Sequence, residues 1–570
     1  MKAGRLSIFL MVLFSLLFYS KASFSQTPSE MDKIDREIDI DEKMRERIEE
    51  TTEMPKIKEE EETFERKEGE EAVFIKQIDV VGVTLFKKEI VRGIVDEYEN
   101  KELSLREIQK IADLITDLYR RKNYLTSRAY IPPQDLSKGV LEIRVLEGIM
   151  GSLTIKGNKY FSSELFEKKM RLKQGDSFNN ELLRKSLVRI NEHPNRHAKA
   201  ILVPGKVPGQ TDVVLEVEDK KPFTAGLEYD NFGSRYIRKY RYSLKCDHGN
   251  ITGHDDILTL KLLKTDHENS YLLSSLRYLL PFWDTFEVGF FATKSRLRLL
   301  EELEPADVRG KSTIYSLFLN KYLVDEETLD IRLTSGFDYK HIRNYQVGNE
   351  TSRDEMRIAK GGFDVDKIDK YGRTIFVNEF SYGIPDIMQG LDDVDVRASR
   401  TGAGGKFTKY NAWLLRLHKL PLNLSLLWKN QLQVSPYILT SSEQFQGGGI
   451  LNNRGYPPAE KVGDEGLSSV MELSLPLTML PESWEVPICK NKLNKTLSAV
   501  GFFDFAHLKL RNPQAGEEKT ETLRSLGCGL RLNVPDKDLS VRLEFGWPLD
   551  ETPSDGDHFR TWAEVTWNFY

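Results

Sequence analysis

The sequence predicts a transmembrane β-barrel that follows two small soluble domains of mixed helix and strand. Residues 221–570 alternate apolar and polar side chains in short segments broken by Gly, Asn, Asp and Pro. Residues 72–220 instead repeat one order of strands and helices twice. The chain also ends in an aromatic strand, residues 559–570. Period-two segments with aromatic ends are typical of barrels that cross a bilayer, where closure leaves no backbone group unpaired.

The apolar stripes within residues 221–570 carry the barrel prediction. Three of them are Met471, Leu473, Leu475 and Leu477; Leu526, Cys528, Leu530, Leu532 and Val534; and Leu539, Val541, Leu543, Phe545 and Trp547. A soluble β-sandwich would show the same alternation, but a strand region of this length would need several domains, and no linker divides it. In the final strand, Trp567, Phe569 and Tyr570 form an aromatic terminus like the insertion signal of outer-membrane barrels.

The N-terminal residues 1–25 predict a secretory signal peptide. Lys2 and Arg5 precede an apolar run from Leu6 to Tyr19, and small residues follow this run. A membrane anchor needs about 20 apolar residues, so the run is too short for one. We therefore expect the chain to be exported.

Residues 26–71 form an acidic helix and linker. Residues 27–71 contain nineteen Asp or Glu and nine Lys or Arg, within a chain whose net charge is −6. From residue 29 to residue 51 the pattern predicts a mostly charged helix with a narrow apolar stripe. A solvated, partly disordered arm would have the same composition. No basic patch in the chain argues for binding to nucleic acid.

Residues 72–148 and 149–220 are predicted to be two α+β domains with the same order of elements. The elements predicted in the first are a strand at 74–81, a helix opened by a capping box of Ser104 and Glu107, and strands at 126–131 and 140–146. The elements predicted in the second are a strand at 153–157, a helix capped by Asn180, and strands at 197–203 and 211–217. Sheets of this kind keep an edge open to which an extended chain can add.

Nothing in the sequence predicts catalysis, a metal site or a cofactor. The three cysteines, Cys246, Cys489 and Cys528, have neither metal-ligand spacing nor the spacing of a disulfide framework. Nucleophile, P-loop and zinc-protease motifs are absent, and the nine histidines do not cluster at ligand spacing. We therefore expect no enzyme, no bound metal and no cofactor.

The most informative segment is a Gly-rich loop between predicted strands, at residues 439–466. Its motif residues are Glu443, Gln444, Phe445, Gly447, Gly448, Arg454, Gly455, Tyr456, Gly463, Asp464 and Gly466. An arginine beside a glycine on a long loop can enter a protein interior, where its planar guanidinium binds a carboxylate in a bidentate manner. Taken alone, Arg-Gly-Tyr would fit an exposed loop equally well.

The carboxylate that fits this arginine is Asp504, in the pattern Phe502-x-Asp504. Its parity is opposite to that of the lipid-facing Phe503 and Phe505. We predict that Arg454 and Asp504 pair inside a hydrated barrel. The pair would act as a latch, meaning a contact that holds the loop against the wall of a pore that opens. Gly455, Tyr456 and Phe502 are the other residues predicted for this latch.

These motifs resemble the outer-membrane transporters of two-partner secretion, the TpsB or haemolysin-activator family. The segments SRAYIPPQDLSKGVLEIRVLEG (127–148) and PGQTDVVLEV (208–217) are similar to the POTRA domains of that family. The resemblance implies sixteen strands, two POTRA domains, an arginine–aspartate pair inside the barrel and an N-terminal helix that plugs it. The chain departs from the family pattern at Asn453, where valine is usual, and at Ala506, where glycine is usual.

The resemblance also implies a function. A TpsB protein lies in the outer membrane with its POTRA domains in the periplasm, where they bind an unfolded TpsA-type client. The barrel then exports the client without ATP. We expect a single-chain pore surrounded by outer-membrane lipid. The alternative is a barrel assembly factor of the same superfamily, which shares the loop and strand motifs but usually has more POTRA domains. A passive porin would need no periplasmic domains.

Overall fold

The computed structural model describes residues 57–59, 72–191, 193, 195–267, 270–283, 285–326, 328–487, 489–514 and 516–569. The predicted signal peptide and nearly all of the predicted acidic helix and linker lie outside these residues. The described residues form two compact units. One unit holds Phe223–Ile251 and the chain from Asp256 onward; the other holds the residues before Phe223 together with Thr252–Asp255. None of the helices in the described ranges is long and apolar enough to cross a membrane.

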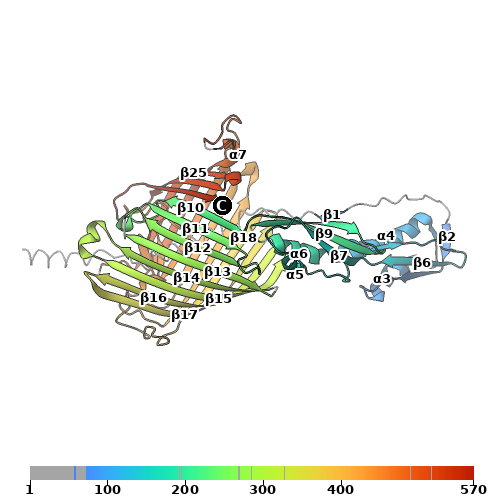
Figure 1. Cartoon of the computed structure of the whole chain (residues 1–570), viewed down its shortest axis with the longest axis horizontal. Coiled ribbons are helices and arrows are strands. Elements are labelled where there is room, and N and C mark those ends of the chain that lie inside the picture. Colours follow the sequence, from blue (N-terminus) through green and yellow to red (C-terminus); the bar gives the residue numbers. More distant parts are fainter. Residues whose placement is uncertain are drawn as a thin grey trace, which may run out of the picture. The chain divides into compact units, whose positions relative to one another are not determined.

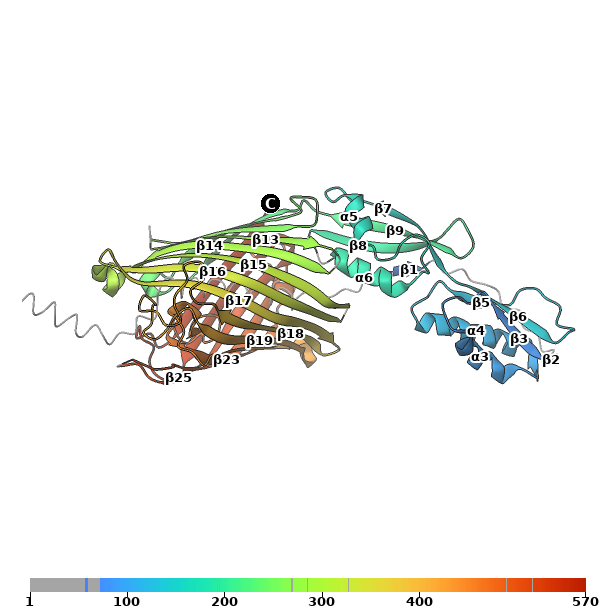
Figure 2. The same cartoon turned by 90° about the horizontal axis from the view of Figure 1, so that it is seen from below.

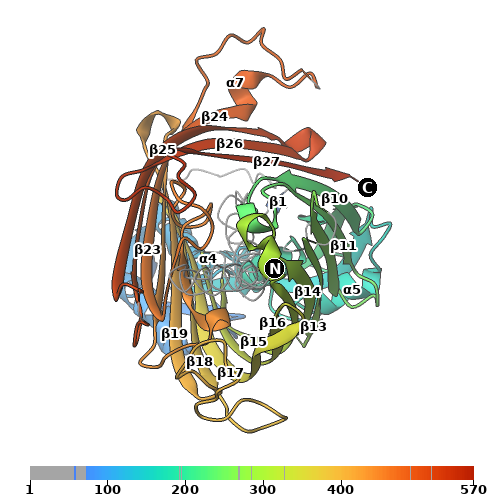
Figure 3. The ribbon, with the colours of Figure 1, turned by 90° about the vertical axis from the view of Figure 1, so that its left-hand side faces the viewer.

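In the first unit, sixteen strands of the described chain close into one antiparallel barrel (Figures 1 and 3). The strands are β10 (Phe223–Asp230), β11 (Arg241–Gly249), β12 (Ile257–Thr265), β13 (Tyr271–Phe282), β14 (Phe286–Arg298), β15 (Arg309–Glu326), β16 (Leu329–Gln346), β17 (Asn349–Asp369), β18 (Gly372–Gly383), β19 (Phe407–Lys419), β20 (Ser425–Val434), β23 (Glu465–Pro476), β24 (Leu497–Lys509), β25 (Thr520–Val534), β26 (Leu539–Pro548) and β27 (Arg560–Phe569). The predicted barrel is confirmed, as is the strand number that the resemblance implies.

Two features of the pairing bear on the site. The barrel closes where β27 pairs with β10, with Trp567 opposite Leu227 and Phe569 opposite Ala225. Between β20 and β23, the chain leaves the wall and forms a separate two-stranded sheet of β21 (Phe445–Gly447) and β22 (Lys461–Gly463). β20 then pairs directly with β23, so the wall is continuous behind this excursion.

The predicted alternation determines which side chains face outward. Along β25, Leu526 and Leu530 are exposed while Ser525 is buried. The same holds on β23, where Met471 and Leu473 are exposed and Glu472 is buried. Because a strand turns successive side chains to opposite faces, the apolar stripes cover the outside and polar residues line the inside.

The second unit contains two α+β domains (Figure 2). The elements of the first are β2 (Ala72–Ile75), β3 (Gln77–Val81), α3 (Lys88–Val95), β4 (Lys101–Ser104), α4 (Leu105–Arg121), β5 (Arg128–Tyr130) and β6 (Val140–Leu146). The strand predicted at 74–81 is wrong as one element, because β2 pairs with β4 whereas β3 pairs with β6. The capping box is confirmed: Ser104 accepts from the Glu107 N–H, and Glu107 accepts from the Ser104 N–H.

One carboxylate, that of Glu147, ties the helix α4 to the end of β6. It accepts hydrogen bonds from the backbone N–H groups of Thr84 and Leu85 and from the Tyr119 hydroxyl. Burial raises the pKa of Glu147, but the hydrogen bonds from Thr84, Tyr119 and Leu85 outweigh it and hold that pKa below its usual value. The charged form of Glu147 is therefore the one that this domain stabilises.

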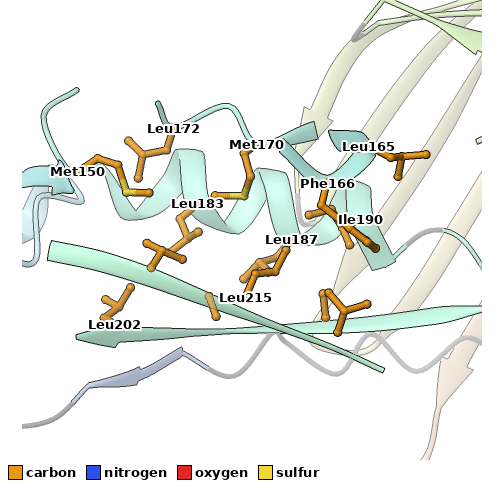
Figure 4. Close-up of a cluster of buried hydrophobic side chains, with 14 of the residues drawn as sticks. Met150, Leu165, Phe166, Met170, Leu172, Leu183, Leu187, Ile190, Leu202 and Leu215 are labelled. Atoms are coloured by element: carbon orange, nitrogen blue, oxygen red, sulfur yellow. The ribbon is translucent and has the colours of Figure 1, made fainter. Parts of the chain in front are cut away.

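The second α+β domain packs two helices on a sheet ordered β1-β8-β9-β7. Its elements are β1 (Ile57–Glu59), β7 (Ile149–Lys156), α5 (Ser163–Lys169), α6 (Asn180–Asn191), β8 (Arg196–Pro204) and β9 (Gln210–Asp219). Leu183, Leu187 and Ile190 of α6 pack toward Leu202 and Leu215 of the sheet (Figure 4). The predicted cap Asn180 is wrong. Its neighbour Asn179 accepts hydrogen bonds from Glu181 N and Leu182 N, while Asn180 is itself in the helix.

Candidate functional site

The loop between β20 and β23, residues 435–464, is called the inner loop below. Its residues 439–449 and 452–459 are all buried. The loop therefore does not extend into solvent, although it connects two strands of a barrel wall. The short sheet of β21 and β22 brings its two arms together, and the segment between them carries Arg454 at its tip.

Arg454 is 2% exposed and contacts Asp504 through three donors. Its backbone N–H and its Nε each donate to Asp504 Oδ2 at 2.9 Å, and its Nη2 donates to Oδ1 at 2.6 Å. The guanidinium and carboxylate planes thus meet in the bidentate arrangement that arginine favours. Asp504 is fully buried. The expectation of a hydrated pair is therefore wrong, since neither charged group of the pair reaches solvent.

Two further carboxylates contact the same guanidinium and were not singled out from the sequence. Arg454 Nη1 donates to Glu472 of β23 at 2.6 Å and to Glu544 of β26 at 3.0 Å. Arg531 of β25 also donates to both glutamates. We call these five residues, Arg454, Asp504, Glu472, Glu544 and Arg531, the arginine site. Strand parity could have indicated that both side chains point into the barrel, because Glu472 and Glu544 each stand between two lipid-facing residues of their strands.

Aromatic groups cover the remaining faces of Arg454. The guanidinium lies over the Phe502 ring, with its carbon 3.4 Å from the ring centroid. The Trp562 indole N–H donates to the Arg454 carbonyl at 2.7 Å. Cation–π attraction is stronger where water is excluded, as it is here. Phe502, which was predicted as a residue of the latch, thus contacts the arginine directly.

Glycines allow the loop tip to lie directly against the wall. A Cβ on Gly455 would lie 2.7 Å from the Pro548 nitrogen and 2.7 Å from Ser525 Cβ. On the wall itself, a Cβ on Gly466 would lie 2.2 Å from the Phe445 ring. Phe445 and Tyr456 form a buried apolar cluster with Ala506, Leu508 and Leu523. Ala506, one of the two departures from the family pattern, therefore packs beneath the loop.

The base of the inner loop is held at a second charged position. Glu443 accepts a hydrogen bond from Lys409 Nζ of β19 at 2.7 Å and forms an ion pair with Lys340 of β16. All three residues are buried. We call Glu443, Lys340 and Lys409 the glutamate site. Glu443 was predicted as a residue of the loop motif, but nothing in the sequence linked it to two lysines on distant strands.

Asp464 fixes the other end of the loop. Its Oδ1 accepts from Leu439 N at 2.8 Å and from Arg400 at 2.7 Å. Its Oδ2 accepts from Arg511 N at 2.6 Å. The remaining motif residues Gln444, Gly447, Gly448 and Gly463 are buried beside these contacts.

The C-terminal aromatic residues are separate from this site. Trp567 is 49% exposed, and its ring lies 5.1 Å from that of Phe569. Tyr570 lies outside the described residues. Across the described ranges, no group of three or more His, Cys, Asp or Glu is arranged to hold a metal ion. Within the arginine site, and likewise within the glutamate site, the charged groups pair with one another.

Fold and site together define a sixteen-stranded β-barrel that holds its own loop inside and follows two α+β domains. The family model described as haemolysin secretion/activation protein ShlB/FhaC/HecB matches residues 209–532. The ShlB-type POTRA model matches residues 73–148, and a POTRA model described as surface antigen variable number repeat matches residues 149–218. The chain belongs to the haemolysin secretion/activation protein family.

Two relatives are similar over most of the chain. The heme/hemopexin transporter protein HuxB of Haemophilus influenzae (strain 86-028NP) is 22% identical over 488 residues, which cover 84% of this chain and 83% of HuxB. The outer membrane transporter CdiB of Dickeya dadantii (strain 3937) is 22% identical over 556 residues, or 95% of each chain.

Solved structures share the fold. CdiB from Escherichia coli has a TM-score of 0.73 at 20% identity, covering 95% of this chain and 99% of CdiB. BamA from Haemophilus ducreyi lacking POTRA domains 1–3 has a TM-score of 0.51 at 14% identity, covering 87% of this chain and all of that one. The predicted two POTRA domains and barrel are thus confirmed.

The chain is a protein transporter that lies in the outer membrane and has its POTRA domains in the periplasm, as predicted. The alternative of an assembly factor has less support, because the family model that spans residues 209–532 is that of secretion and activation proteins.

Proposed function

We propose that the arginine site is the latch of this transporter. The observation that carries the proposal is the burial of Arg454 among three carboxylates that belong to the wall, not to the loop. A loop that only filled the lumen would not need a charged tip. Burying an arginine is unfavourable unless carboxylates lie in good hydrogen-bonding geometry around it. The arrangement defines one position of the loop closely, and a client can pass only if the loop leaves that position.

The client we propose is a secreted TpsA-type protein in an extended form. The relative HuxB is named as a heme/hemopexin transporter, and the relative CdiB is named as an outer membrane transporter. Recognition that relies on main-chain hydrogen bonds depends little on the sequence of the client. No ATP-binding motif stands in the sequence, so we propose that export proceeds without ATP.

The POTRA sheets supply edges for such a client. In the second POTRA domain, β8 already pairs in parallel with β1, through Ile57 opposite Ala200 and Glu59 opposite Leu202. That edge accepts an extended strand from this chain. We propose that the client pairs in the same way at a sheet edge of one of the two domains. If the client uses the β8 edge, the fragment 72–220, which lacks β1, should bind the client's N-terminal region more tightly than the fragment 52–220. Equal binding by the two fragments would place the client at another edge.

The remaining proposals follow from the sequence. We propose residues 1–25 as signal peptide, 26–71 as acidic helix and linker with 29–51 as a plug, 72–148 and 149–220 as POTRA domains, and 221–570 as the barrel. Trp567, Phe569 and Tyr570 are proposed as the signal for insertion into the outer membrane, whose lipid surrounds a single-chain pore. No enzyme activity is proposed.

Comparing the proteins released by cells with and without this chain tests the function. Loss of one large secreted protein, with other outer-membrane barrels unchanged, is the expected result. A broad decrease of barrels would instead favour the assembly factor. No change in secreted proteins, together with altered uptake of small solutes, would favour a passive porin.

A further inference from the structure

The connection between β23 and β24, residues 477–496, differs from its neighbours. Strand direction alternates around the barrel, so this connection lies at the same end as the turns 370–371, 420–424 and 535–538. Outer-membrane barrels have short turns at their periplasmic end, which identifies that end here. The connection 477–496 is not a short turn. It carries α7 (Leu493–Thr496) and projects outward from the barrel wall rather than into the lumen (Figure 3).

Backbone hydrogen bonds join the described residues of the projection, 477–487 and 489–496. Val486 N donates to the Asn491 carbonyl at 2.9 Å, and Leu493 N donates to the Trp484 carbonyl at 2.9 Å, as in a small hairpin. Glu485 and Lys492 form the bridge between its two arms. Asn491 Nδ2 donates to Asp536 of the next turn at 3.0 Å, which ties the hairpin to the barrel end. The side chains that it presents outward are therefore held in place.

The outward side chains combine exposed apolar groups with lysines. Met479 is 74% exposed and Trp484 is 53% exposed, whereas Val486 is buried in the hairpin. Residues 477–496 contain three lysines, at 490, 492 and 495, and two glutamates, at 482 and 485, so their formal charge is +1. Lys492 Nζ lies 4.0 Å from the Glu482 carboxylate. A tryptophan and long lysines at the edge of an apolar region are typical of segments that lie at the boundary between lipid tails and headgroups.

The position of the projection identifies what it contacts. The outer faces of β23 and β24, which it joins, expose Leu473 and Phe503 to lipid. At the same end of the barrel, Trp283 and Trp567 are also exposed. These tryptophans form an aromatic belt at this end of the barrel. The projection extends outward from the belt, at the level of the membrane's periplasmic leaflet. The lysines match anionic headgroups in sign.

We propose that residues 477–496 bind the anionic phospholipid surface of the periplasmic leaflet, with Met479 and Trp484 inserted and the lysines on phosphate groups. The two strands joined by this connection carry Glu472 and Asp504, which hold Arg454 in the arginine site. Lipid binding here therefore fixes the part of the wall that holds the loop tip. The proposal does not require the latch, since it concerns the outer surface of the barrel.

The test places a fluorescent probe on the projection of the full-length protein in lipid nanodiscs. The three native cysteines are replaced by alanine, and Met479→Cys is labelled with an environment-sensitive dye. Asp538→Cys, in the tight turn 535–538 at the same end, is the matched control. Nanodiscs contain phosphatidylethanolamine alone or with added phosphatidylglycerol, and part of the lipid is brominated near the headgroup to quench nearby dye.

We expect the Met479 probe to be blue-shifted and strongly quenched, and the Asp538 probe to be neither. Phosphatidylglycerol should deepen the quenching, and the combined variant K490Q/K492Q/K495Q should lose that increase while keeping normal barrel heat-modifiability. Equal quenching at both positions would overturn the proposal. So would a Met479 probe that stays aqueous in both lipids and becomes shielded only when client is added, because the surface would then serve a protein partner.

Discussion

The two charged sites of the inner loop have formal net charges of opposite sign. At the arginine site, two guanidiniums, of Arg454 and Arg531, face three carboxylates, so the formal charges sum to −1. At the glutamate site, one carboxylate, of Glu443, faces two lysines, so they sum to +1. The loop thus contributes the cation at its tip and the anion at its base. In both places the excess charge belongs to the wall.

This difference indicates how the loop is positioned. The carboxylates around the tip come from β23, β24 and β26, whereas the lysines around the base come from β16 and β19. The loop therefore contacts two separate parts of the wall. One part carries carboxylates and pairs with the arginine at the tip of the loop, and the other carries lysines and pairs with the glutamate at its base. Buried ion pairs add little net stability because desolvation offsets their attraction. Their effect is to specify position, and exchanging tip for base would place like charges together.

Arg454→Ala should give the largest effect. It removes the guanidinium that the loop contributes to the arginine site, while the backbone N–H of residue 454 remains. Three buried carboxylates then keep only Arg531 as their cation, a change that typically costs roughly 3–5 kcal/mol. The closed barrel should still insert, because its backbone pairing is untouched. Client secretion should collapse and pore conductance should change. Arg309→Ala, which removes an exposed arginine paired with Asp307, is the matched control and should secrete normally.

Asp504→Ala in the same assay distinguishes a pair from a larger site. If Arg454 and Asp504 acted alone, the two variants would be equivalent. Because Glu472 and Glu544 also contact the guanidinium, Asp504→Ala should lose less secretion than Arg454→Ala. The double variant should be little worse than Arg454→Ala alone. Strictly additive losses would show that the two residues act independently and would remove the basis for a latch.

Glu443→Gln tests the base of the loop. The amide keeps the shape and can still accept a hydrogen bond, but two buried lysines lose their carboxylate partner. Removing one partner of a buried charge pair costs roughly 2–5 kcal/mol. We expect faster hydrogen exchange in residues 435–449 and reduced secretion, with slower exchange retained around Arg454. Glu350→Gln, at an exposed pair with Arg353, is the control. If exchange rose equally at tip and base, the loop would move as one body.

Gly455→Ala displaces the tip without changing any charge. The added Cβ would lie 2.7 Å from backbone of Pro548 and 2.9 Å from that of Trp547, and backbone atoms of a barrel wall move little. Overpacking of this kind costs typically 1–3 kcal/mol. Secretion should fall less than with Arg454→Ala. Gly501→Ala on β24, whose Cβ would have no atom within 4 Å, is the matched control. Normal secretion by Gly455→Ala would show that the tip need not lie against the wall.

The sequence predicts features that follow a repeating pattern along a strand, and it does not predict contacts that depend on the path of the loop. Alternation along a strand identified the barrel, and parity alone placed Asp504 inward. Parity could not select Glu472 and Glu544, because many inward positions of a barrel are polar and only the path of the loop brings these two to Arg454. Lys340 and Lys409 were missed for the same reason. In the second POTRA domain, two adjacent asparagines are chemically identical as caps, so backbone geometry alone selects Asn179.

Asn453→Val should have the smallest effect, and of opposite sign. Asn453 is fully buried beside Arg454, and neither its amide nitrogen nor its amide oxygen has a hydrogen-bond partner among the described residues. A buried polar group without a partner is destabilising by about 1–3 kcal/mol, whereas valine, the residue usual in the family, has no polar side-chain atoms. The variant should therefore stabilise the loop in its observed position.

Hydrogen exchange around residues 445–456 should slow, while Asn349→Val at an exposed position should leave it unchanged. If export requires the tip to leave the arginine site, secretion should slow as well. Faster exchange in Asn453→Val would show that the asparagine supports this position of the loop, and slower exchange with unchanged secretion would show that leaving it does not limit export.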